Sequence, residues 1–166
     1  MDANAGRWLR AGQVGRPHGL DGSFHVRRAV PRLLRAGATV LVCGRRTRIV
    51  RRAGDAHRPI VRLEAWTDRP AAETLNGQEL LVDRADAPEL DEDEWWADDL
   101  IGCLVYDGAR EVGAVRQLIA LPSCEVLEVG TNEGGELLVP LISDAVRAVD
   151  VERRRIEVDV RFLAVE

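Results

Sequence analysis

Residues 85–102, ADAPELDEDEWWADDLIG, divide the chain into two parts. The first ten of them, residues 85–94, contain one proline, six acidic residues and almost nothing that a hydrophobic core can use. Short alternating runs of apolar and polar residues continue on both sides of this segment. We therefore predict an acidic linker at 85–94 that joins two small domains, residues 1–84 and 95–166.

Two adjacent tryptophans, Trp95 and Trp96, follow the acidic run in a chain that has only four tryptophans. Neighbouring side chains point about 100° apart in a helix and to opposite faces in a strand, so one packed face cannot easily hold both rings. We expect at least one ring to contact a partner or to pack between the two domains, and both alternatives remain open. The other two tryptophans, Trp8 and Trp66, are expected in the core or at its edge.

The net charge of the chain, −5, hides a strong asymmetry. Residues 1–85 carry 16 arginines against 8 acidic residues, a net charge of +8, whereas residues 86–166 carry 7 arginines against 20 acidic residues, a net charge of −13. Such a division predicts partners of opposite sign: phosphates for the first half and a basic protein for the second.

The composition is that of a globular protein, with 46% hydrophobic and 31% charged residues in a chain of 166. Its apolar runs are far shorter than a membrane span, and no charged-then-apolar leader opens it. We expect a soluble, cytoplasmic protein with no membrane partner.

The sequence contains no recognisable catalytic or ligand-binding pattern. Cys43, Cys103 and Cys124 are odd in number and widely spaced, which favours buried reduced thiols over disulfides or a zinc site. The three histidines form no metal-binding pattern, and the motifs of serine hydrolases and P-loop nucleotide binders are missing. We therefore expect no catalytic residues, no metal, no cofactor and no small-molecule substrate.

The acidic run with Asp98 and Asp99 offers many carboxylate oxygens, which raises the alternative of a cation site. The spacing and central glycine of an EF-hand are missing. A solvated acidic segment that attracts a basic protein is the better interpretation.

Both halves show short strand patterns. In the first, SFHVRR (23–28) is followed by TVLVCG (39–44), TRIVRR (47–52) and PIVRLEAW (59–66). The last three recur at roughly 8 to 12 residues, which favours a barrel or a sandwich. The second contains about six short strand patterns, beginning with LIGCLVYD (100–107), and no long helix.

One helical turn or two is expected at DRPAAETLNG, residues 68–77. Asp68 is a suitable N-cap, Pro70 occupies an early helical position, and Gly77 can take the left-handed conformation that ends a helix. A strand, QELLVDR (78–84), should follow.

The stretch VGRPHGLDGSFHVRR (14–28) has two interpretations. Its three glycines are typical of a tight connection between strands, where glycine provides positive φ. Alternatively it is an exposed loop in which four residues present cations and donors to RNA phosphate. These candidate RNA-binding residues are Arg16, His18, Arg27 and Arg28.

This stretch also resembles the amino-terminal signature of the ribosome maturation factor RimM family, close to V-G-x-x-x-G-x-x-G-E-x-x-V. AAETLNGQELLVDR (71–84) is similar to the family's A-E-x-L-x-G-x-x-L stretch. DEWWADDLIGCLVYDGAREVGAVRQL (93–118) and LLVPLISDAVRAVDVERRRIEVDV (137–160) resemble the start and the end of its carboxy-terminal PRC-barrel. Together these matches cover nearly the whole chain in the family's order.

The chain departs from the family pattern at three places. Ser23 stands where the family usually has glutamate, and RFLAVE (161–166) replaces the usual Gly-Leu-Leu ending. Trp95 and Trp96 stand where family members often have two tyrosines, which keeps an aromatic pair.

The resemblance implies an all-β fold of two small β-barrels, a translation-factor-like barrel and a PRC-barrel, joined by the acidic linker. It implies a non-catalytic assembly factor that binds the immature 30S subunit near its head and assists 16S rRNA maturation and ribosomal protein incorporation. The aromatic pair, with Asp98 and Asp99, would then contact the small-subunit ribosomal protein numbered nineteen. Large amphipathic rings suit such an interface, because tryptophan is enriched at binding hot spots.

Two other functions remain as alternatives. An RNA-processing or RNA-modifying enzyme with an attached RNA-binding barrel would need an acid–base or nucleophile set, and none is visible in the sequence. A membrane-associated or photosynthetic PRC-barrel scaffold unrelated to ribosomes would have little use for the basic first domain.

Overall fold

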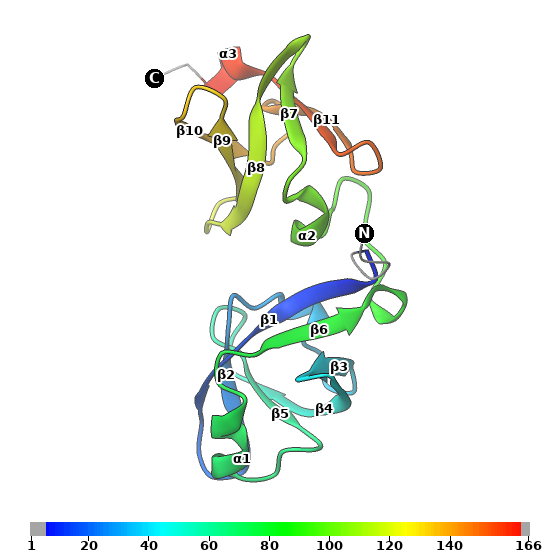
Figure 1. The fold of residues 1–166 in the computed structure, drawn as a ribbon, viewed down its shortest axis with the longest axis vertical. Helices are drawn as coiled ribbons and strands as arrows, with labels where there is room; N and C mark the ends of the chain where they lie inside the picture. The colour runs from blue at the N-terminus through cyan, green and yellow to red at the C-terminus, as the bar shows by residue number, and fades with distance from the viewer. Residues whose placement is uncertain (1–5, 164–166) are drawn as a thin grey trace. The chain divides into compact units, whose positions relative to one another are not determined.

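The chain forms two compact units in a computed structural model that describes residues 6–163. The units comprise residues 1–90 and 91–166, and they divide within the segment expected to be a linker. Both are built from short strands with few helices (Figure 1), so the all-β prediction is confirmed. Residues 1–5 and 164–166 of the predicted domains, including the end of RFLAVE, lie outside the described residues.

The first unit is a closed six-stranded barrel with the strand order β1-β2-β5-β4-β3-β6. Its strands are β1 (Trp8–Pro17), β2 (Phe24–Arg27), β3 (Thr39–Val42), β4 (Arg45–Ala53), β5 (Ile60–Leu63) and β6 (Glu79–Asp83). Two short 3₁₀ turns, η1 (Pro31–Leu33) and η2 (Arg84–Asp86), and one helix, α1 (Arg69–Thr74), lie between or after them.

Alternation along the strands builds the core of the barrel. Phe24, Ile49, Leu63 and Leu80 are completely buried, and the residue that follows each of them is exposed or half-buried. Most of the arginines of the first unit therefore lie on its outer surface. Trp8 and Trp66 are half-buried, as expected of residues at the edge of a core.

Helix α1 forms as predicted. The Asp68 carboxylate accepts a hydrogen bond from the Ala71 backbone N–H at 2.8 Å, which satisfies one of the free donors at the helix start. Pro70 lies in the first turn, and Gly77 has a φ of +88° after the helix end. This cap explains why so short a helix begins at Arg69.

The expectation that all three cysteines are buried is wrong for Cys43. Cys43 and Gly44, with φ of +49° and +72°, form the two-residue turn between β3 and β4, and Cys43 is exposed. Such turns need positive φ at both positions, and a turn tip faces solvent. Cys103 is buried and Cys124 is half-buried.

The second unit is a curled, half-barrel sheet of six strands in the order β10-β9-β8-β7-β12-β11 (Figure 1). Its strands are β7 (Leu104–Asp107), β8 (Arg110–Ala120), β9 (Glu125–Thr131), β10 (Glu136–Pro140), β11 (Val146–Asp150) and β12 (Arg155–Val158). The pairing of β12 with β7 is parallel, and all other pairs are antiparallel. Leu100, Val105, Leu127, Val139 and Ile156 are buried in its core.

Two short helices were not expected in the second unit, α2 (Ala97–Leu100) and α3 (Val160–Leu163). The strand expected from Leu100 begins only at Leu104, because Leu100 ends α2 and Gly102 turns the chain at a φ of +79°. Across residues 6–163, none of the helices has the length and apolarity needed to cross a bilayer.

Candidate nucleic-acid and protein interfaces

The connection between β1 and β2, residues 18–23, is held by several local contacts. The His18 N–H donates to the Ser23 carbonyl at 2.7 Å. The Asp21 carboxylate pairs with Arg51 at 3.2 Å, and the same oxygen lies 3.9 Å from Arg62, which ties the connection to β4 and β5. This is the tight β-connection that the glycines indicate.

Gly22 is the position in this connection that only glycine can fill. Its φ is +84°, and an added Cβ would stand 2.2 Å from the Trp66 carbonyl oxygen. Leu20, at the tip of the connection, is 79% exposed. The connection is therefore both tightly packed at its base and open at its tip.

All four predicted RNA-binding residues lie on or beside the paired strands β1 and β2, and all four are exposed. Arg16 is near the end of β1 and His18 begins the connection. Arg27, at the end of β2, also donates through Nη2 to the Val14 carbonyl at 3.3 Å. Arg28 follows in a left-handed conformation, with φ of +48°. All four are therefore carried by one pair of neighbouring strands and the residues directly beside it.

Two neighbours of this group are not among the sequence predictions, His25 and Arg58. The His25 ring packs edge-on against the His18 ring, with 5.1 Å between centroids and 88° between planes. Burial lowers the pKa of His25, and the positive charges of His18, Arg16 and Arg58 lower it further. The alternation of His25 with the buried Phe24 and Val26 is the signal that could have identified it as an outward residue.

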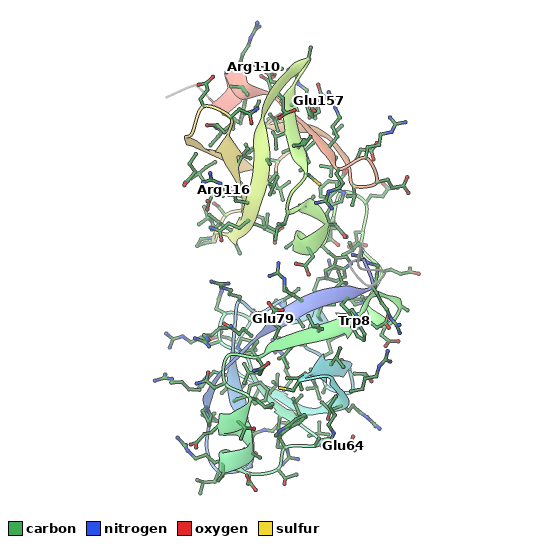
Figure 2. The ribbon with its side chains drawn as sticks, in the orientation of Figure 1. Trp8, Glu64, Glu79, Arg110, Arg116 and Glu157 are labelled. Atoms are coloured by element: carbon green, nitrogen blue, oxygen red, sulfur yellow. The ribbon has the colours of Figure 1, made fainter. Side chains whose placement is uncertain are left out.

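The tryptophan rings of the first unit are already occupied by arginines. Trp8 lies at the start of β1 (Figure 2). The Arg7 and Arg46 guanidinium groups lie 5.2 and 5.3 Å from its ring centroid. Arg45 lies 5.5 Å from the Trp66 ring in the same way. These cation–π contacts stabilise the barrel edge, so neither ring is a ready stacking platform for a base.

The four predicted protein-binding residues lie at the start of the second unit. Trp95 is half-buried and packs against the core of this unit, and Trp96 is 8% exposed. Asp98 and Asp99 are half-buried in the first turn of α2, where carboxylates favour the helix N-terminus. Asp99 also accepts a hydrogen bond at its carbonyl from the Cys103 thiol at 3.2 Å.

In the part of the chain that the structure describes, no group of three or more histidine, cysteine or acidic residues is arranged to hold a metal ion. One cavity of about 490 Å³ lies beside η1 and β3 in the first unit. Its lining includes Arg32, Arg35, Thr39 and Asp86, and neither histidine nor cysteine.

Family models match both units. The model described as RimM N-terminal domain matches residues 9–87, and the model described as RimM PRC barrel domain matches residues 97–162. The chain is 39% identical over 141 residues to "Ribosome maturation factor RimM" of Rubrobacter xylanophilus, covering 84% of this chain and 86% of that protein. It is 34% identical to the protein of the same name from Frankia alni, covering 89% and 91%.

The structure is also similar to the solution structure of the N-terminal domain of RimM from Thermus thermophilus, with 30% identity and a TM-score of 0.45. That match covers 51% of this chain and 99% of the other. The sequence relatives span most of both chains, and the two domain matches follow each other in the order that the sequence motifs indicate. The chain therefore belongs to the RimM family.

Proposed function

We propose that this protein is a non-catalytic ribosome assembly factor that binds the immature 30S subunit near its head. There it assists 16S rRNA maturation and the incorporation of ribosomal proteins. The observation that carries the proposal is that relatives similar over most of the chain are named ribosome maturation factors. That name supports a role in ribosome maturation, which takes place in the cytoplasm.

The first unit is assigned to rRNA. Residues 1–85 have a net charge of +8, and Arg16, His18, Arg27 and Arg28 are exposed on two paired strands. Arginine and histidine donors on a rigid strand pair suit phosphate oxygens, which fix the position of a protein on RNA.

The second unit is assigned to a basic ribosomal protein, the one numbered nineteen in the small-subunit head. Residues 86–166 have a net charge of −13, which attracts a basic partner and repels naked RNA. Trp95 and Trp96 would supply the apolar contacts, with Asp98 and Asp99 beside them on α2.

Such a factor needs no chemical step and no cofactor. A protein that binds one conformation of the subunit head more tightly than the others shifts the population toward that conformation. Release follows when the mature surface no longer favours the factor. Separation of cell extracts by sedimentation tests the assignment: the protein should travel with free 30S subunits, and its recovery with membranes would favour a PRC-barrel scaffold.

The RNA assignment has its own test. The full chain should bind single-stranded RNA with a log affinity that falls linearly with log salt, with a slope of about 0.7 for each phosphate neutralised. Changing Arg27 and Arg28 together to glutamate should reduce both the affinity and the slope, measured by fluorescence anisotropy at several salt concentrations.

The matched control changes Arg110 and Arg153 to glutamate. Both are exposed arginines of the second unit, so the net charge changes equally. This control should bind RNA nearly as the wild type does. Equal losses in the two double variants, or affinity that ignores salt, would contradict a phosphate-binding face on the first unit.

A further inference from the structure

Three side chains of the first unit gather around His25. His18 comes from the β1–β2 connection, Arg16 from the end of β1, and Arg58 from the turn between β4 and β5. The pairing of β2 with β5 brings them together, because His25 lies opposite Ile60 and the Val26 N–H donates to the Pro59 carbonyl at 2.9 Å.

The backbone holds this group in place. An added Cβ at Gly15 would stand 2.8 Å from the His25 carbonyl oxygen, so β1 approaches β2 closely beside Arg16. The Asp55 carboxylate accepts hydrogen bonds from the His57 and Arg58 N–H groups at 2.8 and 2.7 Å, which fixes the turn that carries Arg58. Little reorganisation is therefore needed before a ligand binds.

Positive charge predominates in this group. Two loop carboxylates of the first unit have other hydrogen-bond or ion-pair partners. Asp21 pairs with Arg51. Asp55 accepts from backbone N–H groups of its turn, and its charge also attracts that of Arg58. Within residues 6–163, none of the four side chains forms an ion pair with an acidic residue. Like charges held together in this way favour an added anion.

We infer that Arg16, His18, His25 and Arg58 form one phosphate-binding site, which takes a phosphate group of the RNA backbone together with a proton. Two guanidinium groups and two imidazole rings offer donors to several oxygens of one phosphate, and charged donors bind such oxygens most strongly. The inference rests on the proposed assignment of RNA to the first unit and adds His25, Arg58 and the proton to it.

Proton uptake follows from the charges around His25. In the free protein, burial and then the charges of His18, Arg16 and Arg58 lower the pKa of His25. A bound phosphate supplies the opposite charge and accepts the imidazole N–H, so it raises this pKa. RNA affinity should therefore increase as pH falls, by up to about tenfold per pH unit for each proton taken up.

The test measures binding of the full chain to a short RNA that contains only uridine, whose bases do not titrate between pH 6 and pH 8. Fluorescence anisotropy at constant ionic strength should show severalfold tighter binding at pH 6 than at pH 8. Changing His18 and His25 together to glutamine should remove most of this pH dependence. Arg58→Gln should weaken binding at every pH. It should also reduce the slope of log affinity against log salt by the amount expected for about one phosphate contact.

His57→Gln is the matched control, because His57 is an exposed histidine of the turn that carries Arg58 and makes no ring contact within residues 6–163. It should keep the wild-type affinity and pH dependence. Wild-type binding that does not change with pH, or a double histidine variant with the wild-type pH dependence, would overturn the inference and leave the RNA assignment standing.

A second measurement follows the imidazole resonances of the full chain by NMR while inorganic phosphate or the RNA is added. Both ligands should shift His18 and His25 before His57. A response to inorganic phosphate without RNA binding would confirm an anion site and contradict the RNA assignment. Resonances that respond to neither ligand would overturn the site itself.

Discussion

His25 is a half-buried imidazole among positive charges, and this environment disfavours its protonated form. Its folded-state pKa lies below the value of about 6.5 that it has in an unfolded chain, so the unfolded state takes up the proton first as pH falls. This residue contributes stability fully above the unfolded pKa, and the contribution is lost as pH falls through the folded pKa.

Replacing His25 with glutamine should therefore flatten the pH dependence of stability. Between pH 7.5 and pH 5.5 the melting temperature of the wild type should fall more than that of His25→Gln, as thermal unfolding followed by circular dichroism can show. His57→Gln should retain the wild-type difference. A His25 variant that loses as much stability over this interval as the wild type would show that its environment does not act on folding.

Single residues also show where sequence patterns stop being informative. Arg16 and His18 are exposed, as their place in a charged stretch between two strand patterns predicts. Cys43 is exposed because it forms a two-residue turn, although free cysteine is usually buried. Arg58 comes close to His25 only through the pairing of β2 with β5. No local sequence pattern contains that pairing.

At the scale of elements, the β1–β2 connection depends on backbone shape more than on side chains. Gly22→Ala should destabilise the protein by at least ~2 kcal/mol, because the new Cβ adds a backbone collision to the strain of positive φ. Gly44 is the matched control: it has a similar φ of +72° and open space around it.

Gly44→Ala should then cost only about 1 to 2 kcal/mol, the penalty of the left-handed conformation itself. Urea unfolding of both variants, compared with the wild type, gives the difference that is due to the Trp66 carbonyl. Equal losses in the two variants would mean that the connection can move away from Trp66 without cost.

Strand positions were largely predictable because each strand is amphipathic with a period of two, as the buried Phe24 and Val26 beside the outward His25 illustrate. Helix α1 was predictable for a local reason as well, its Asp68 cap. The parallel pairing of β7 with β12 was not, because it joins Leu104 to Arg155 across about fifty residues of chain. Long-range pairings are decided by the closure of the whole sheet.

At the scale of the whole molecule, composition alone indicates the division into two units. The acidic segment at 85–94 contains the boundary between the units at Leu90, and the net charge changes from +8 to −13 across it. Barrel closure in the first unit, by contrast, was an expectation from family resemblance, since strand spacing also permits a sandwich. The Cα pairing of Leu41 with Leu81 and the β1–β6 ladder close that barrel.

Trp95 and Trp96 lie at the start of the second unit, which is the unit proposed to bind the ribosomal protein. Trp96 is nearly buried and Trp95 packs half-buried against the second core, so truncating Trp96 should destabilise the unit more than truncating Trp95. The more exposed ring is the better candidate for an interface anchor, because it keeps area to bury on binding. Trp95→Ala should therefore weaken binding to small-subunit protein nineteen by at least ~2 kcal/mol, about thirtyfold.

The measurement pairs thermal unfolding of each variant with its titration by the purified ribosomal protein in a calorimeter. Trp95→Tyr should restore most of the affinity, since tyrosine keeps a large ring with few rotatable bonds. Trp66→Ala is the matched control, a half-buried tryptophan of the first unit, and should bind within about twofold of the wild type while folded. If Trp95→Ala and the double alanine variant unfold at clearly lower temperature yet bind normally below it, the pair is a structural element, and the partner must bind another surface of the acidic unit.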